Sequence, residues 1–318
     1  GRKGGLEQRA IAIGTQGLAD VFYLMDYIFT SEEARQLNKE IFETIYFAAI
    51  TESMELCKFG EYKPYDFFNG SPMSKGVFQF DMWGLDYEGL GRMWDWDSLK
   101  LEVSNHGVCN SLFTAQMPVA SSAKITGSFE MTEPAHSALF NRRVVGGEIL
   151  IVNKYLINDF EKLGVWCEDL KNEIIMNEGS VQNINFNNYL DTEDKNYNKK
   201  VKRIEHLIPK YKTIWEISQR ELIDMAADRA PFIDQSQSMN IYMSEPTLSK
   251  ISSSHFHSWG KGLKTICYYV RTKAISTGAK HLAVDISKVG QSKPIEKPTV
   301  ELTQKPTDTE FECFGCGS

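Results

Sequence analysis

The sequence predicts an α/β fold, because segments with helical periodicity alternate with short apolar runs typical of strands. The clearest helix covers 31–59, where Ser31 is a suitable N-cap and apolar residues recur at every fourth position. Two strands, 110–116 and 262–272, combine apolar, aromatic and β-branched side chains. A chain of 318 residues is long enough for one large domain or two ordinary ones.

The remaining elements follow from the same patterns. Glycine or proline ends most of the periodic segments, as expected at helix termini. The expected helices cover 18–29, 31–59, 97–106, 154–163, 166–177, 211–229 and 247–261, and a loop and strand are expected over 232–243. Residues 65–96 are predicted to form loops. Residues 183–205 are rich in Asn and Lys and lack periodicity, which predicts an exposed insertion.

Composition excludes several classes of protein. The net charge of −7 argues against a nucleic-acid binder, which must displace counterions from phosphates. No apolar run approaches the roughly 20 residues that span a bilayer, and the polar start lacks the apolar region of a signal peptide. Six mostly isolated cysteines are typical of a reducing compartment, so we expect a cytoplasmic protein without membrane or nucleic-acid partners. A start without Met suggests a processed or trimmed beginning.

A change of composition near Asp285 divides the chain into a folded part, 1–284, and a tail, 285–318. The tail is dominated by Lys, Pro, Thr and Gln and cannot bury enough apolar surface to offset its ordering entropy, so it is expected to be disordered. Cys313 and Cys316 form a C-x-x-C pair there, without the further ligands of a zinc site. Thiol–disulfide exchange suits the pair better than an incidental occurrence.

The stretch 117–123 predicts a turn from a strand into a helix. Backbone N–H groups at a helix start attract anions, and the hydroxyls of Ser121 and Ser122 add donors. The segment lacks the glycine and lysine pattern of a P-loop, and ordinary N-capping by serine explains the same residues. Both interpretations remain open from the spacing.

The adjacent Tyr268 and Tyr269 also allow two interpretations. Aromatic side chains suit a pleated, half-buried surface, so a buried strand is the ordinary one. A pair of phenols can alternatively pass an electron and a proton between neighbours.

No metal site is predicted. His255 and His257 are two positions apart and do not share a helical face, since facing pairs need a spacing of three or four. The cysteines outside the tail are expected to be small core residues. They are Cys57, Cys109, Cys167 and Cys267.

Short motifs are spread along the chain. They are IGTQGLAD at 13–20, SPMSKG at 71–76, QFDMW at 79–83, MPVASSA at 117–123, WEISQ at 215–219, FIDQSQS at 232–238, LKT at 263–265, YY at 268–269 and CFGCGS at 313–318. In this order they resemble the C-terminal half of the large, catalytic subunit of class I ribonucleoside-diphosphate reductase. Their number and order argue against a chance match.

The resemblance implies a fold and a substrate site. The family fold is a ten-stranded α/β barrel of two five-stranded halves, of which this chain would form the second. A ribonucleoside diphosphate would be the substrate and would lose its 2′-hydroxyl, giving a deoxyribonucleotide for DNA synthesis. Its diphosphate would be held by the loop of Pro118, Val119, Ala120, Ser121 and Ser122.

The resemblance also implies redox roles. Tyr268 and Tyr269 would be the last two steps of a radical relay that starts in a small subunit. The tyrosyl radical and di-metal centre would belong to that subunit, so this chain would bind no cofactor. Cys313 and Cys316 would reduce an active-site disulfide after each turnover, and thioredoxin or glutaredoxin would then reduce them.

Two departures qualify the resemblance. Val119 stands where relatives commonly carry a hydroxyl residue, so only its backbone could bind phosphate. The radical cysteine of the family lies in an Asn-x-Cys-x-Glu loop, and none of the six cysteines has those neighbours. That cysteine is therefore expected on another chain, the N-terminal half of the large subunit, beside which this chain would act as an enzyme. The alternatives are a non-catalytic assembly or regulatory partner of a complete reductase, and a stand-alone dithiol carrier.

Overall fold

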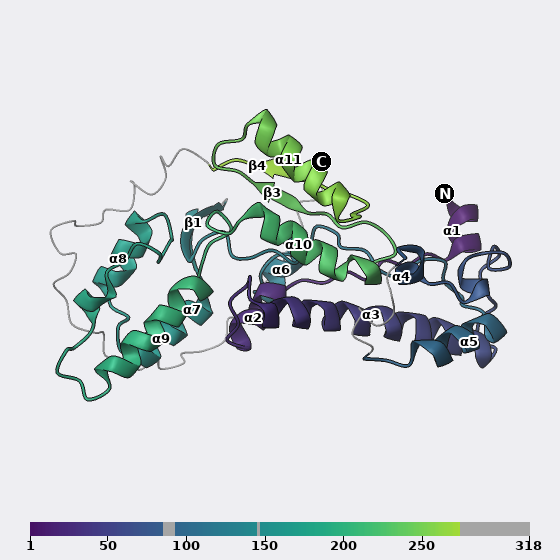
Figure 1. The fold of residues 1–318 in the computed structure, drawn as a ribbon, viewed down its shortest axis with the longest axis horizontal. Helices are drawn as coiled ribbons and strands as arrows, with labels where there is room; N and C mark the ends of the chain where they lie inside the picture. Colours follow the sequence, from purple (N-terminus) through teal and green to yellow (C-terminus); the bar gives the residue numbers. More distant parts are fainter. Residues whose placement is uncertain (85–92, 145–146, 274–318) are drawn as a thin grey trace, which may run out of the picture.

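The computed structural model describes residues 1–84, 93–144 and 147–273 (Figure 1). The helices are α1 (Arg2–Gln8), α2 (Leu18–Leu24), α3 (Glu32–Lys58), α4 (Gln79–Met82), α5 (Trp96–His106), α6 (Ala120–Thr126), α7 (Lys154–Leu163), α8 (Glu168–Met176), α9 (Tyr197–Lys210), α10 (Gln219–Arg229) and α11 (Leu248–Gly260). Short 3-10 helices are η1 (Met73–Lys75), η3 (Phe186–Tyr189) and η4 (Ala230–Phe232). The strands are β1 (Leu139–Val144), β2 (Gly147–Val152), β3 (Asn240–Tyr242) and β4 (Tyr269–Arg271). The α/β prediction is confirmed.

Four chain segments lie side by side as parallel strands. Their parallel pairs are Ile13 with Thr114, Gln116 with Gln237, and Asn240 with Tyr269. The predicted strand at 110–116 is therefore an inner member of the sheet, between the first motif and β3. Parallel neighbours need long crossover connections, which explains the helices that separate these segments in the sequence.

Helix α3 confirms the helix predicted at 31–59. The Ser31 hydroxyl accepts a hydrogen bond from the Ala34 N–H at 3.2 Å, and Glu32 and Glu33 occupy the first turn, where the helix dipole favours acids. Its buried side chains recur along the helix, which packs against α10 and α5 (Figure 1). The helix thus supports the sheet along its length.

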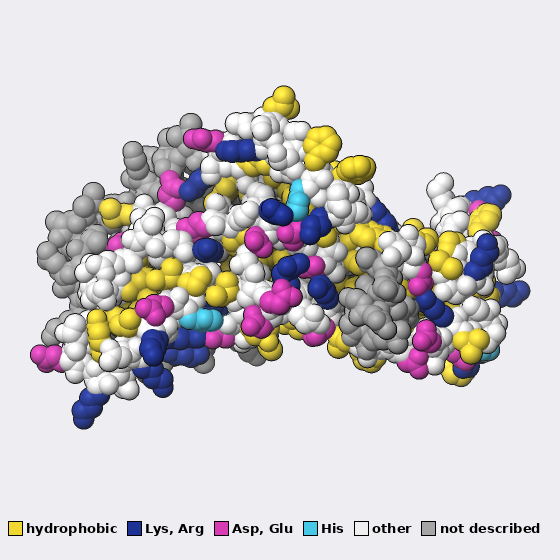
Figure 2. Space-filling view, in the orientation of Figure 1, with side chains coloured by type: hydrophobic (Ala, Val, Ile, Leu, Met, Phe, Trp, Pro, Cys, Tyr) yellow, Lys and Arg dark blue, Asp and Glu magenta, His cyan; other side chains and the backbone are white. Residues whose placement is uncertain are grey.

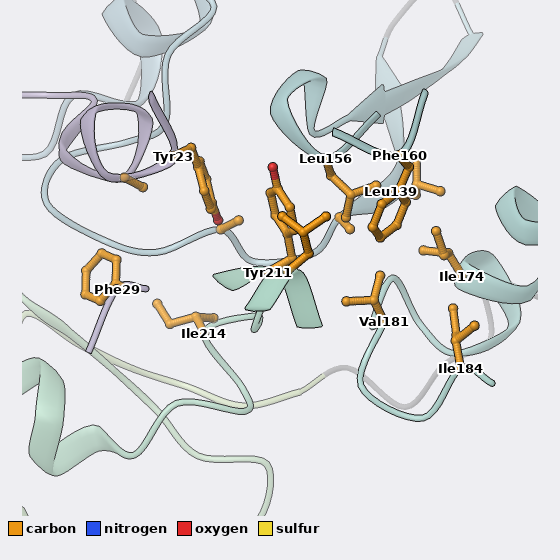
Figure 3. Close-up of a cluster of buried hydrophobic side chains, with 14 of the residues drawn as sticks. Tyr23, Phe29, Leu139, Leu156, Phe160, Ile174, Val181, Ile184, Tyr211 and Ile214 are labelled. Carbon is orange, nitrogen blue, oxygen red and sulfur yellow. The ribbon is translucent and has the colours of Figure 1, made fainter. Parts of the chain in front are cut away.

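A large apolar core joins the helices at one end of the molecule (Figure 3). Tyr23 stacks on Tyr211 with ring centroids 5.2 Å apart, and Phe160 meets Tyr211 edge-on at 6.2 Å. A second core, between α3, α5 and the sheet, contains Phe113 and Phe232. Burying side chains of this size stabilises the fold by about 1.5–3 kcal/mol each.

The prediction of an exposed insertion at 183–205 is wrong. Phe186 and Leu190 are buried in the first core, and α9 adds Ile204 and Leu207 to it. Asn and Lys occupy most of the exposed positions of this segment. They outnumber the apolar residues, and the buried stripe is therefore hard to recognise in the sequence.

An ion cluster around the buried Lys210 attaches α9 to this core. The Lys210 side chain is only 2% exposed, and its ammonium lies 2.7 Å from an Asp26 oxygen and 2.8 Å from an Asp159 oxygen. The Tyr211 hydroxyl donates to Asp159 at 2.6 Å, and Arg203 donates to Asp26 at 2.7 Å. The Arg203 hydrogen bonds, with a further contribution from Lys210, hold the pKa of Asp26 well below its usual range.

The helix expected at 18–29 is shorter than predicted and ends at Leu24. Asp26 takes a left-handed backbone conformation with φ of 61°, which cannot continue a right-handed helix. The turn directs the Asp26 carboxylate towards Arg203 and Lys210 of the ion cluster. Among the residues that the structure describes, no helix combines the length and apolar character needed to cross a membrane.

The helix expected at 211–229 begins only at Gln219. Before it, the Glu216 carboxylate accepts the Thr213 N–H at 2.7 Å and closes a turn that separates α9 from α10. The antiparallel hairpin of β1 and β2 has no counterpart in the prediction. The helices predicted at 97–106, 154–163, 166–177 and 247–261 are confirmed within one or two residues at each end.

Candidate functional site

The candidate phosphate loop and the tyrosine pair lie at the same edge of the parallel sheet. Gln116 pairs with Gln237, and Tyr269 pairs with Asn240, three residues further along the same strand segment. The candidate loop follows directly after Gln116, and Tyr269 pairs with Asn240 further along in the same direction. A single segment, 237–242, lies between the residue that precedes the candidate loop and the tyrosine strand. The fold thus brings together two motifs that are far apart in the sequence.

The phosphate loop leads directly into α6. Val119 is the N-cap and makes no side-chain capping bond, so Ala120, Ser121 and Ser122 form the first helical turn. Their backbone N–H groups precede any acceptor within the helix, and Pro118 and both serines are exposed. N-capping by serine is therefore the wrong interpretation. The helix start presents its N–H groups and the Ser121 side chain to solvent.

The first motif positions this helix start. The Ser122 hydroxyl donates to Gln16 Oε1 at 2.8 Å, and Gln16 Nε2 donates to Thr126 Oγ1 at 2.8 Å. Thr15 donates to Gln116 Oε1 through its N–H at 3.1 Å and its hydroxyl at 2.8 Å. Two neighbouring strands and α6 are thereby held in one arrangement.

Tyr268 and Tyr269 stand at the start of β4 with their rings in contact. The ring centroids are 4.3 Å apart and the planes meet at 63°. The strand predicted over 262–272 is confirmed only for Tyr269–Arg271, and the predicted burial is wrong, because the side chains of Tyr268 and Tyr269 are 51% and 50% exposed. The hydrogen bond with Tyr269 is the main cause that raises the pKa of Tyr268. Both phenols are in contact with each other and with solvent, an arrangement that core packing does not require.

A polar cluster behind β4 has no counterpart in the sequence prediction. The Tyr242 hydroxyl lies 2.5 Å from Glu133 Oε2, to which it donates, and 2.7 Å from His136 Nε2. Glu133 Oε1 accepts the Asn240 side-chain N–H at 2.7 Å. Burial raises the pKa of Tyr242 and lowers the pKa of His136. Because Asn240 pairs with Tyr269, these hydrogen bonds hold β3 in place beside the tyrosines. The polar groups of Asn240 and Tyr242, at alternate positions of one strand, are the sequence pattern that could have predicted the cluster.

Two further motifs join neighbouring strands. The Asp234 carboxylate accepts the Phe113 N–H at 2.7 Å and the Thr114 N–H at 2.9 Å. Lys264 Nζ donates to the Asp234 carbonyl oxygen at 2.5 Å and to the Ile233 carbonyl oxygen at 3.2 Å. These bonds connect the segment before the phosphate loop to the segment before the tyrosines.

Cys313 and Cys316 lie outside the described residues, together with the whole predicted tail, 285–318. Within 1–84, 93–144 and 147–273, no group of three or more His, Cys, Asp or Glu side chains is placed to hold a metal ion. The candidate site residues within the described part of the chain are therefore those at the start of α6 and the tyrosine pair.

Comparison with known proteins gives a consistent result. The family model described as "Ribonucleotide reductase, barrel domain" matches residues 2–269. The chain is 43% identical over 307 residues to the ribonucleoside-diphosphate reductase large subunit of Plasmodium falciparum (isolate Dd2), covering 95% of this chain and 36% of that protein. It is 44% identical over 297 residues to the large subunit of Caenorhabditis elegans, covering 93% and 35%.

A solved structure shows a similar fold. It is the Actinobacillus ureae class Id ribonucleotide reductase alpha subunit, with a TM-score of 0.61 and 22% identity. The match covers 86% of this chain and 41% of that one. The chain therefore spans about a third of the length of the curated relatives and less than half of the solved one.

Proposed function

The chain belongs to the ribonucleotide reductase barrel-domain family, and from this membership we propose that it supplies part of the catalytic centre of a class I ribonucleoside-diphosphate reductase. Together with the remaining part of a large subunit and a radical-generating small subunit, it reduces ribonucleoside diphosphates to deoxyribonucleoside diphosphates. The tyrosyl radical and di-metal centre belong to the small subunit in this proposal.

One observation carries the proposal: two touching, exposed phenols lie at the same sheet edge as an uncapped helix start. An anionic diphosphate suits the N–H groups of Ala120, Ser121 and Ser122. Between Tyr268 and Tyr269, a radical moves in one direction when an electron and a proton move in the other. Their rings are in contact, with centroids 4.3 Å apart, so the proton can move between neighbouring hydroxyl groups with the electron and no charge accumulates in the pair.

We assign the reducing equivalents to Cys313 and Cys316. Conversion of one ribonucleotide removes the 2′-hydroxyl as water and consumes two electrons and two protons. An active-site pair of thiols, expected on the other part of the large subunit, supplies both and becomes a disulfide. Cys313 and Cys316 reduce that disulfide by exchange and become oxidised, and thioredoxin or glutaredoxin then reduces them. The sequence supports this step through the C-x-x-C spacing.

The proposal is tested by combining this chain with a polypeptide that supplies the remaining part of a large subunit, with a small subunit, and with thioredoxin. Deoxyribonucleoside diphosphate should form only in the complete mixture. If the components associate but no product forms, the catalytic proposal fails, and a non-catalytic assembly partner becomes the better interpretation.

Helix α11 offers a docking face for the small subunit. Leu248, Phe256 and Trp259 are 84%, 70% and 75% exposed and lie on one side of the helix. Figure 2 shows hydrophobic side chains at the upper edge, where Figure 1 places α11. The face directly precedes the tyrosine strand in the chain, so a partner bound there would be close to the relay.

We expect Trp259→Ala to weaken binding of the small subunit by about 10- to 30-fold, because exposed aromatic anchors dominate such interfaces. Titration calorimetry of the assembled large subunit with the small subunit measures this change. Leu101→Ala is the matched control, since Leu101 is 63% exposed on α5, away from this face. Equal effects of the two substitutions would exclude α11 as the docking face.

A second prediction concerns the phosphate loop. Ser121→Asp places a carboxylate in the first turn of α6, where it competes with the substrate diphosphate for the N–H groups. We expect KM for the substrate to rise about 10-fold while kcat changes little. Ser121→Ala keeps the N–H groups and should raise KM much less. An unchanged KM in Ser121→Asp would place the diphosphate elsewhere.

A further inference from the structure

Two cysteines from distant parts of the chain meet between α3 and the segment that leads into the sheet. Ser53 Oγ lies 3.3 Å from Cys109 Sγ, and the Cys109 N–H donates to the Ser53 carbonyl oxygen at 3.3 Å. Cys57 follows Ser53 by four residues on α3, and residues at this spacing share a helix face. The side chain of Cys57 is therefore directed at the same segment as that of Ser53.

The surroundings of the two thiols differ. Cys109 is 3% exposed, whereas Cys57 is partly exposed to solvent. Burial, and then the neighbouring Cys109 thiol, raise the pKa of Cys57 to about 11, while nearby Arg9 opposes the shift. Cys109 Sγ contacts the Ser53 hydroxyl, and Cys57 is one turn further along the same face of α3, so the two thiols lie on the same side of the helix. Arg9 Nε donates to the Cys109 carbonyl oxygen at 2.9 Å, so it belongs to the same cluster.

We propose that Cys57 and Cys109 form a reversible disulfide when the protein meets a peroxide, a modification site separate from the proposed reductase chemistry. The more accessible Cys57 thiolate attacks a peroxide oxygen, the O–O bond breaks, and hydroxide leaves. The Cys109 thiolate then attacks the Cys57 sulfenic sulfur, the S–S bond forms and the second oxygen leaves as water. Two thiols lose two electrons, and hydrogen peroxide becomes two molecules of water.

The raised pKa sets the speed of this reaction. Thiolate is the reactive form, and little of it exists at neutral pH when the pKa is about 11. The pair therefore oxidises slowly. Both thiols stay reduced in a reducing compartment, and the disulfide forms only under sustained oxidation. A small dithiol reopens it by exchange.

The disulfide would fix a particular junction of the fold. The Asn110 N–H donates to Ser53 Oγ at 3.1 Å, and Asn110 Nδ2 donates to the Arg9 carbonyl oxygen at 2.7 Å. The cluster therefore joins α3 to the starts of two parallel strands. Closing the long loop 57–109 restricts the unfolded chain, so we expect Tm to rise by about 5–10 °C in the oxidised form.

The test treats the full chain with hydrogen peroxide at mildly alkaline pH, blocks free thiols, digests with trypsin and maps disulfides by mass spectrometry. The expected product joins the peptides 40–58 and 101–124, with the loss of two hydrogen atoms. Dithiothreitol should separate them, and Tm should return to the value of the untreated chain.

Single substitutions show whether the joined peptide and the rise in Tm depend on this pair or on other cysteines. Cys57→Ser should abolish both the joined peptide and the rise in Tm, whereas Cys167→Ser, which removes a buried cysteine from the other core, should keep both. Cys109 is buried, so Cys109→Ser could prevent folding. In that case Cys57→Ser is sufficient to test the proposal, because Cys57 is partly exposed and its replacement should leave the fold intact. The proposal is overturned if Cys57 and Cys109 remain thiols, oxidise separately, or join only to other cysteines.

Discussion

Replacing Tyr269 with Phe is expected to abolish deoxyribonucleotide formation in the reconstituted enzyme, down to the level measured without a small subunit. Phenylalanine fills the same space but has no hydroxyl, so it can be neither oxidised at a useful potential nor joined to Tyr268 by a hydrogen bond. Folding should be unaffected, because the Tyr269 side chain is half exposed. Single-turnover product analysis and the Tm of the variant measure the two effects.

A double substitution in the tail distinguishes the loss of radical transfer from the loss of reducing equivalents. Cys313→Ser with Cys316→Ser should permit one round of product and then stop, since only the regeneration step is lost. Added dithiothreitol should restore part of its turnover, but none in Tyr269→Phe. A full first turnover in Tyr269→Phe would show that no radical passes through this residue.

Replacing Lys210 with Ala is expected to lower the free energy of unfolding by about 3–5 kcal/mol, the usual cost of removing one partner of a buried ion pair. Its ammonium lies within 2.8 Å of both Asp26 and Asp159, and only 2% of its side chain is exposed. Without it, Asp159, whose side chain is 14% exposed, loses its closest cation beside the Tyr211 hydroxyl, while Arg203 still pairs with Asp26. Denaturant unfolding followed by tryptophan fluorescence measures the loss.

Lys171→Ala provides the control for this substitution. Lys171 pairs with Glu168 at 2.6 Å, but the side chains are 29% and 54% exposed, and such pairs contribute at most about 1 kcal/mol. A loss in Lys210→Ala no greater than in Lys171→Ala would mean that the buried cluster does not stabilise the fold.

The cluster also predicts a pH dependence. The pKa of Asp26 is lowered in the folded protein, chiefly by Arg203 and further by Lys210. Its stabilising contribution is complete above the unfolded pKa of about 4 and is lost as the pH falls towards the folded pKa. Removing Lys210 reduces the shift, so the difference in unfolding free energy between wild type and Lys210→Ala should narrow below about pH 4.

Local sequence patterns predicted the structure correctly where one residue determines the backbone conformation of a helix cap or a turn. Ser31 caps the start of α3, where its hydroxyl accepts a hydrogen bond from the Ala34 N–H. The turn into α6 follows directly after Pro118. The first-turn position of Ser121 and Ser122 was close to expectation, although Val119 takes the cap. Helix caps and turns depend on residues within a few positions of each other, which is why the sequence is sufficient to locate them.

The polar segments gave the largest errors. The stretch at 183–205 reads as solvent-exposed, yet α9 is held by a buried Lys210 and by apolar residues in the first core. The carboxylates that make this burial possible come from Asp26 and Asp159, far away in the sequence. A pattern within one segment cannot reveal charges that another segment neutralises.

By itself, the sequence determined the α/β class, the boundaries of five helices to within two residues, the family and the identity of the candidate loop and tyrosine pair. Tertiary structure alone decided that Tyr268 and Tyr269 are exposed rather than buried, and that one segment, 237–242, separates their strand from the segment leading into the candidate loop. It also decided that Glu133 and Tyr242 support the strand beside them. Register and exposure follow from pairing between strands that are 29 residues apart, as for Asn240 and Tyr269, or more than 100 apart, as for Gln116 and Gln237. Periodicity within one segment contains no information about this pairing.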